Sequence, residues 1–233
     1  MEPEGTVRHV YVEATESEGR CPENEKIAYV RVRSAELGRG ALVGQMAPQL
    51  IAEWKDLARQ EAKRFPASAR VLTVAARASG DLDLARRAVK ADPNYAPASV
   101  ALAQAMIGAG DPSGALKVLA GVASLDATSD GLVALGRARL ATRDFKGAAK
   151  AATAALSHRQ IDLVEPDAGD PRPSAAAHEI AARAALGLGR YDDAAGHLLQ
   201  ADSHSPGVRE LLEHPTPELR RALRAQHRPA QRP

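Results

Sequence analysis

Histidine is the residue type in this chain best suited to chemistry, because it can bind a metal or act as a general acid and base. A helical zinc site needs two histidines four residues apart and a further ligand. His178-Glu179 begins in that way, but Arg183 stands near the place of the second ligand. His197 and His204 lie seven residues apart on one predicted helix face, yet two imidazoles alone do not make a metal site. We therefore predict no metal site and expect all seven histidines at the surface or at helix ends.

The other candidate residues lack the partners that their chemistry needs. Cys21 is the only cysteine and lies beside Pro22 with no identifiable base, which excludes an internal disulfide and a cysteine-based zinc site. Gly38, Gly40 and Gly44 imitate a nucleotide-binding fingerprint, but their spacing is wrong and no βαβ unit surrounds them. A glycine hinge is the simpler interpretation. With no nucleophile elbow or phosphate loop, we predict a protein that is not an enzyme and needs no cofactor.

The proline-containing segment 157–173 carries four acidic residues: Asp162, Glu165, Asp167 and Asp170. Carboxylates in a loop could hold a divalent cation, but these lack the ligand spacing and the terminal glutamate of a calcium-binding loop. We expect a solvated acidic loop.

The composition favours packed helices. The chain is 45% hydrophobic but only 3% aromatic, so most apolar side chains are alanine and leucine, which favour helix and allow close packing. A net charge of +2 with well-mixed signs gives no reason to expect nucleic acid as a partner. No apolar run approaches the roughly 18 residues of a membrane span, which predicts no membrane insertion. The cytoplasm is the expected compartment, with the periplasm as the alternative if a leader has been removed.

The two ends of the chain differ from its middle. In the N-terminal segment 1–44, the runs 7–12 and 27–33 are rich in strand-forming residues and predict a β-hairpin. Residues 45–65 follow as an amphipathic helix whose apolar stripe includes Trp54, and we expect this helix to cap the next domain. The C-terminal segment 207–233 predicts a capping helix and a basic tail.

One short phrase recurs four times through the middle of the chain. Its third residue falls at positions 80, 110, 143 and 189, so the steps are 30, 33 and 46 residues, the last containing the insert 157–173. Such a period is typical of a solenoid of helical hairpins. The sequence thus predicts a mainly α fold over residues 66–206, with these helix pairs: 67–78 and 82–91, 97–108 and 112–123, 129–141 and 145–157, and 174–187 and 191–203.

These helix pairs resemble the tetratricopeptide repeat family. The likeness is best in the fourth unit, where Ala182, Ala194 and Ala201 stand at the family's helix crossings. Tyr191 takes its aromatic position after the turn, and Pro206 takes its closing proline. The family's tryptophan is absent from the first helices, and divergent helical hairpins of another kind are the alternative. The resemblance implies an α–α superhelix over about four repeats.

The resemblance also implies where a partner binds, because the first helix of each pair lines a concave groove in this family. The corresponding positions here are Arg70, Val74, Arg77, Gln104, Ile107, Val133, Arg137, Leu140, Glu179, Arg183 and Leu186. Their arginines suit the capture of carboxylates, so we expect a peptide or helix of another protein, with an acidic or C-terminal segment favoured. The alternative is that these arginines form only a solvated face.

The predicted function is a protein–protein interaction adaptor. Two alternatives remain at this point. One is a structural component that assembles with itself into a homo-oligomer, through the β-hairpin edge or the solenoid ends. The other is an accessory subunit of an enzyme or transport complex whose active part is another chain.

Overall fold

A computed structural model describes residues 48–122, 125, 128–157, 173–201, 203 and 205–226. In this described part every regular element is an α-helix, eleven in all, and there is no strand. The predicted β-hairpin, Cys21, the glycine hinge and the acidic residues of the insert lie outside the described residues. The helices belong to two compact units, α3–α7 and α8–α13, which are described separately.

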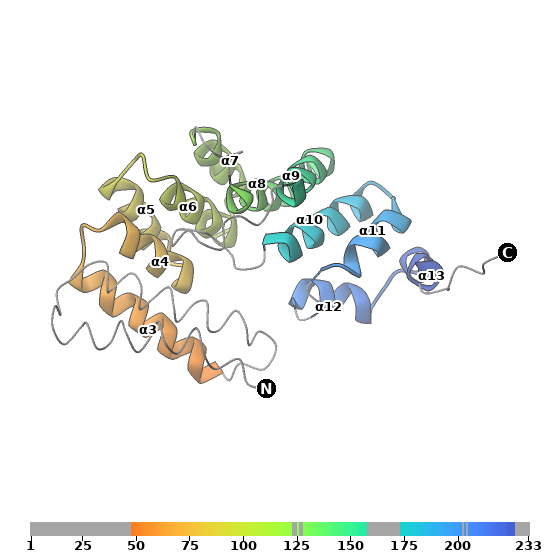
Figure 1. Ribbon diagram of the computed structural model, residues 1–233, viewed down its shortest axis with the longest axis horizontal. Helices are drawn as coiled ribbons and strands as arrows, with labels where there is room; N and C mark the ends of the chain where they lie inside the picture. The colour runs from red at the N-terminus through yellow and green to blue at the C-terminus, as the bar shows by residue number, and fades with distance from the viewer. Residues whose placement is uncertain are drawn as a thin grey trace. The chain divides into compact units, whose positions relative to one another are not determined.

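Unit 1 holds five helices, drawn from orange to yellow-green in Figure 1: α3 (Pro48–Arg64), α4 (Ala69–Ser79), α5 (Leu82–Ala91), α6 (Ala96–Gly108) and α7 (Pro112–Ala120). The helices α4–α5 and α6–α7 pack as consecutive pairs, and α3 packs on α4. The core consists largely of alanine with Val71 and Leu72. Small side chains bring these helix axes close together, as the composition predicts.

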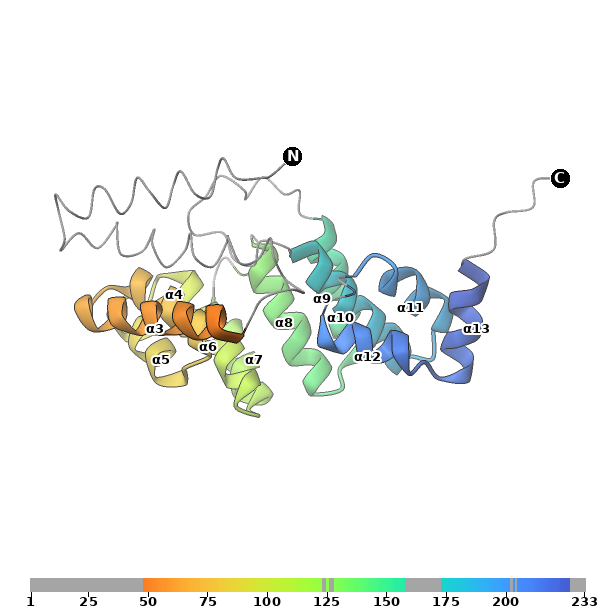
Figure 2. The ribbon, with the colours of Figure 1, turned by 90° about the horizontal axis from the view of Figure 1, so that it is seen from below.

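Unit 2 holds six helices, drawn from green to blue: α8 (Ser129–Ala141), α9 (Phe145–Ser157), α10 (Pro173–Gly187), α11 (Tyr191–Leu198), α12 (Pro206–Glu213) and α13 (Pro217–Gln226). The pairs α8–α9 and α10–α11 pack internally, α10 packs on both members of the preceding pair, and α13 packs on α11 (Figure 2). Leu198 and Leu219 are fully buried among alanines in the last part of the unit.

The helix bounds agree with the sequence prediction at most ends, but α11 is shorter than expected. It ends at Leu198, five residues before the predicted end at residue 203. The backbone N–H groups of Gln200 and Ala201 both donate to the carbonyl of His197, at 3.0 Å. The last carbonyls are thus satisfied by a closing turn instead of a further turn of helix.

The recurring phrase forms the turn inside each helix pair. Its third residue has a positive φ in all four turns: 68° at Gly80, 84° at Gly110, 62° at Arg143 and 72° at Gly189. In three of the turns the next residue is an aspartate at the N-cap of the second helix, namely Asp81, Asp111 and Asp144, whose carboxylate accepts backbone N–H bonds of the first turn. The phrase therefore stops one helix with a left-handed residue and starts the next with a cap.

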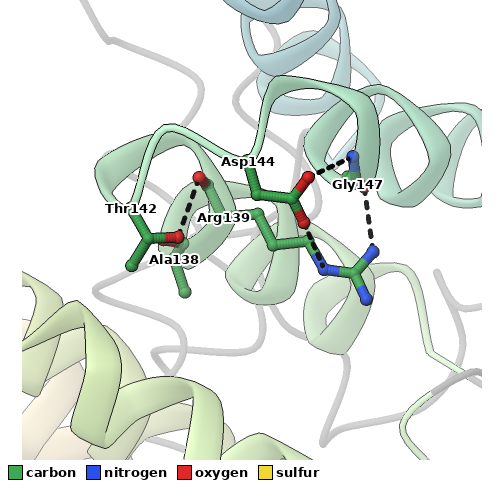
Figure 3. A network of polar contacts seen from close by, with 5 residues as sticks. All are labelled: Ala138, Arg139, Thr142, Asp144 and Gly147. Atoms are coloured by element: carbon green, nitrogen blue, oxygen red, sulfur yellow. Dashed lines mark hydrogen bonds and ion pairs between the residues drawn. The ribbon is translucent and has the colours of Figure 1, made fainter.

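In the α8–α9 turn, further side-chain contacts join the two helices (Figure 3). The backbone N–H of Gly147 donates to Asp144 Oδ1 at 2.9 Å, and Arg139 Nη1 donates to the carbonyl of Gly147 at 2.9 Å. Arg139 Nε lies 3.8 Å from Asp144 Oδ2, and the Thr142 hydroxyl donates to the carbonyl of Ala138 at 3.2 Å. One arginine of the first helix thus holds the beginning of the second.

Candidate partner-binding site

The groove positions implied for unit 1 differ in exposure. Arg70 on α4 is exposed, whereas Arg77 on α4 and Gln104 and Ile107 on α6 are half-buried. Val74 is only 3% exposed and belongs to the core of the unit. Its side chain packs inside the chain, so the other four are the positions that a partner can reach.

The first three positions of unit 2 lie on α8. Val133 is 1% exposed and lies in the core with Ala148 and Ile180. Leu140 is half-buried and packs against the same core. Arg137 is exposed, and it makes no hydrogen bond or ion pair with any residue that the structure describes. Arg137 is therefore the groove residue of unit 2 whose charge is available to a partner.

The valines are buried because the first helices have neighbours on more than one side. Helix α4 contacts α3, α5 and α6, and every residue from Val71 to Ala76 is buried. Helix α8 contacts α9 and α10 in the same manner. A first helix with neighbours on several sides exposes only a narrow strip of its surface. The family positions alone do not tell which residues lie on that strip.

The remaining groove positions lie on α10, and two of them interact within the chain. Arg183 Nε donates to Glu179 Oε1 at 3.0 Å, and the hydroxyl of Ser205, just before α12, donates to Glu179 Oε2 at 2.9 Å. A Cβ atom at position 207 would collide with Arg183 Nη2, so the guanidinium lies against the first turn of α12. Glu179 and Arg183 thus connect α10 with α12. Leu186, the third position on α10, packs half-buried against the adjoining core.

The structure also brings together a pair that the sequence analysis did not identify. His178 Nδ1 on α10 and His197 Nδ1 on α11 lie 3.0 Å apart, with the rings tilted by 43°. Burial, and secondarily the neighbouring charge of His197, lower the pKa of His178 from its ordinary value of 6.5. The signal was present in the sequence, because the two histidines lie 10 and 9 residues from Leu188 in the turn, and residues at similar distances from a turn face each other in an antiparallel hairpin.

Within the described ranges, no group of three or more histidine, cysteine, aspartate or glutamate side chains could hold a metal ion. In the same part of the chain, none of the helices combines the length and the apolar character that a membrane crossing requires.

The turn geometry and the paired packing agree with a family match. The family model described as tetratricopeptide repeat matches residues 75–140, from within α4 to Leu140 in α8. Residues 75–140 belong to the tetratricopeptide repeat family. The resemblance inferred from the recurring phrase is thereby confirmed. Tetratricopeptide repeats generally mediate interactions between proteins and are typically non-catalytic.

A solved structure that contains a similar chain is a crystal structure of the APC/C hetero-tetramer Cut9-Hcn1, with 16% sequence identity and a TM-score of 0.42. The match covers 88% of this chain and 45% of that chain, so this chain spans less than half the length of that neighbour. No curated protein matches the chain. The family assignment therefore rests on the tetratricopeptide repeat match over residues 75–140.

Proposed function

We propose that this protein is a non-enzymatic adaptor that binds a peptide or helix of another protein on the first helices of its tetratricopeptide repeat hairpins. The observation that carries the proposal is the exposed Arg137 on α8, a first helix, which has no hydrogen-bond or ion-pair partner among the described residues. An arginine whose N–H groups are not engaged can use them to bind a ligand carboxylate.

The partner-facing residues are a subset of the family positions. Arg70, Arg77, Gln104 and Ile107 supply polar and apolar contacts in unit 1, and Arg137 supplies the main charge in unit 2. Val74 and Val133 support the surface from within the cores. Arg183 contributes less charge to a partner, because Glu179 already accepts a hydrogen bond from its Nε atom.

The charge of this surface favours an acidic segment as the ligand. Arginine binds carboxylates in a bidentate manner, and a charge-assisted hydrogen bond is about twice as strong as a neutral one. In unit 2, the half-buried Leu140 on the same helix as Arg137 adds apolar surface to that charge. Carboxylates with an aliphatic residue nearby are the chemistry that this surface recognises.

The test is a pull-down from host lysate with identification by mass spectrometry, using wild type, Arg137→Glu and Arg87→Glu. Arg87 is exposed on α5, a second helix, and like Arg137 it has no hydrogen-bond or ion-pair partner among the described residues. We expect one partner to be retained by wild type and Arg87→Glu and lost by Arg137→Glu. Equal retention by both variants would contradict the proposal. Recovery of the protein alone by all three would instead support self-assembly.

A further inference from the structure

Unit 2 contains a basic depression on α9. This helix is the second of its pair, whereas the surface proposed above lies on first helices. The depression has a volume of about 540 Å³ and is lined by α9 and by the α10–α11 turn. Three of its lining residues are cations, namely Lys146, Lys150 and Arg190, and none is acidic.

Two of these cations have no partner in the described part of the chain. Lys146 and Lys150 are exposed, one helical turn apart on α9, and neither forms an ion pair or hydrogen bond there. Arg190 is less available, since its Nη2 lies 2.6 Å from Asp193 Oδ2. Two like charges one turn apart disfavour the helix slightly, so a bound anion would relieve that repulsion.

Apart from the three cations, the residues that line the depression offer a ligand mainly apolar surface. Ala149, Ala154 and Leu188 supply hydrocarbon surface. The hydroxyls of Thr153 and Ser157 already donate to the carbonyls of Ala149 and Thr153, at 3.0 and 2.9 Å. Their protons are therefore engaged, and the two lysines are the groups that an anion would meet.

We propose that this depression binds an acidic peptide segment of a partner protein in which an aliphatic side chain stands between carboxylates. The carboxylates pair with Lys146 and Lys150, and the aliphatic side chain covers Leu188 and the two alanines. A free inorganic anion would use the charges but leave the apolar surface exposed to water. This site uses residues of a second helix and does not depend on the first-helix surface proposed above.

The test uses a fluorescein-labelled peptide of three Asp-Leu repeats, with hexa-aspartate and three Asn-Leu repeats as comparison probes. Anisotropy titration of the full chain is expected to rank Asp-Leu above hexa-aspartate and to show no binding of Asn-Leu. The Lys146→Gln, Lys150→Gln double variant is expected to bind Asp-Leu on the order of tenfold more weakly, because two exposed ion pairs are lost. Binding should also weaken as salt is raised.

The charge-matched control is Lys90→Gln, Lys117→Gln, which removes two exposed lysines from the second helices α5 and α7 of unit 1. It should bind like wild type, and an equal loss in both double variants would show unspecific attraction and overturn the site. Carbodiimide cross-linking of the bound peptide should map to Lys146 or Lys150, and labelling elsewhere would contradict the assignment. Circular dichroism checks that both double variants are folded.

Two further outcomes separate this proposal from its alternatives. Inorganic phosphate and unlabelled Asp-Leu peptide are each added as competitors of the cross-link between the labelled peptide and the lysines. If phosphate blocks this cross-link at a lower concentration than the unlabelled peptide does, the depression is a small-anion site and the peptide proposal fails. If Arg137→Glu abolishes Asp-Leu binding while the Lys146 and Lys150 variant leaves it intact, the peptide binds the first-helix surface instead. That result would support the adaptor function and overturn this site, so the two proposals fail independently.

Discussion

The Nδ1 atoms of His178 and His197 lie 3.0 Å apart, so one imidazole donates a hydrogen bond that the other accepts. At least one of the two Nδ1 atoms must therefore carry no proton. His178 lies within α10 and His197 lies in the last turn of α11, so the contact joins the two helices of this hairpin. The pair therefore makes the packing of this hairpin sensitive to protons.

We predict that the protein loses stability as the pH falls below the ordinary histidine value of 6.5. Because the pKa of His178 is lowered in the folded state, the unfolded chain binds more protons in this range, and acid favours unfolding. Urea unfolding at about pH 7.5 and about pH 5 measures the loss for wild type and for His178→Gln. The variant should lose less stability than wild type between the two conditions. An identical loss in both proteins would contradict the assignment.

Among the residues that the structure describes, Arg143 is the only non-glycine residue with a positive φ. We predict that Arg143→Gly stabilises the protein. Removing a side chain from the left-handed region recovers roughly 1–2 kcal/mol, of which the greater freedom of glycine in the unfolded chain cancels a part. We expect a net gain of about 0.5 to 1 kcal/mol in the free energy of unfolding. Arg137→Gly, at an exposed position inside α8, is the control and should cost about 1 kcal/mol.

Asp144→Ala should destabilise the protein by about 1 kcal/mol, because it removes the acceptor for the Gly147 N–H at the start of α9. Asp144→Asn keeps an oxygen in that place but loses the charge that faces Arg139. Because the ion pair is exposed, Asn should cost only a few tenths of a kcal/mol. Thermal unfolding of both variants gives the comparison, and equal losses would show that the cap is not the main contribution.

Gly187→Ala and Gly196→Ala should change stability in opposite directions, although both glycines lie in helices of the same hairpin. A Cβ atom at position 187 would lie 2.5 Å from Cδ1 of Phe145, so the ring has to move and we expect a loss of about 1–3 kcal/mol. At position 196 nothing lies within 4 Å, and alanine should add about 0.5 to 1 kcal/mol. Chemical denaturation of the two variants checks both signs. A gain at position 187 would show that Phe145 relaxes without cost.

The sequence was sufficient for the turns and for most helix bounds, because period and cap residues are local signals. The aspartates after positions 80, 110 and 143 are helix-start residues by type, and glycine at three of the four left-handed positions is the expected choice. The residue type does not indicate the left-handed conformation of Arg143, and only its place in the recurring phrase, equivalent to that of three glycines, indicates it.

The exposure of the groove positions could not be settled in the same way. Helix α8 carries apolar residues around most of its circumference, so its period does not say which side is covered. Val133 is buried, and so is Val74 in α4, because these two first helices each pack against more than one neighbouring helix. The Glu179–Ser205 hydrogen bond joins residues that are 26 positions apart in the sequence, and no local sequence pattern predicts such a contact.

The turns described above also bear on how such a chain can change its length. Each turn is closed by residues of the hairpin to which it belongs: Asp81 caps α5, Asp111 caps α7 and Asp144 caps α9. None of these caps borrows an atom from a neighbouring hairpin. A duplicated stretch of gene encoding one hairpin would therefore also encode the residues that end its first helix and cap its second. The number of hairpins can grow or shrink in whole steps without redesign of the turns that remain.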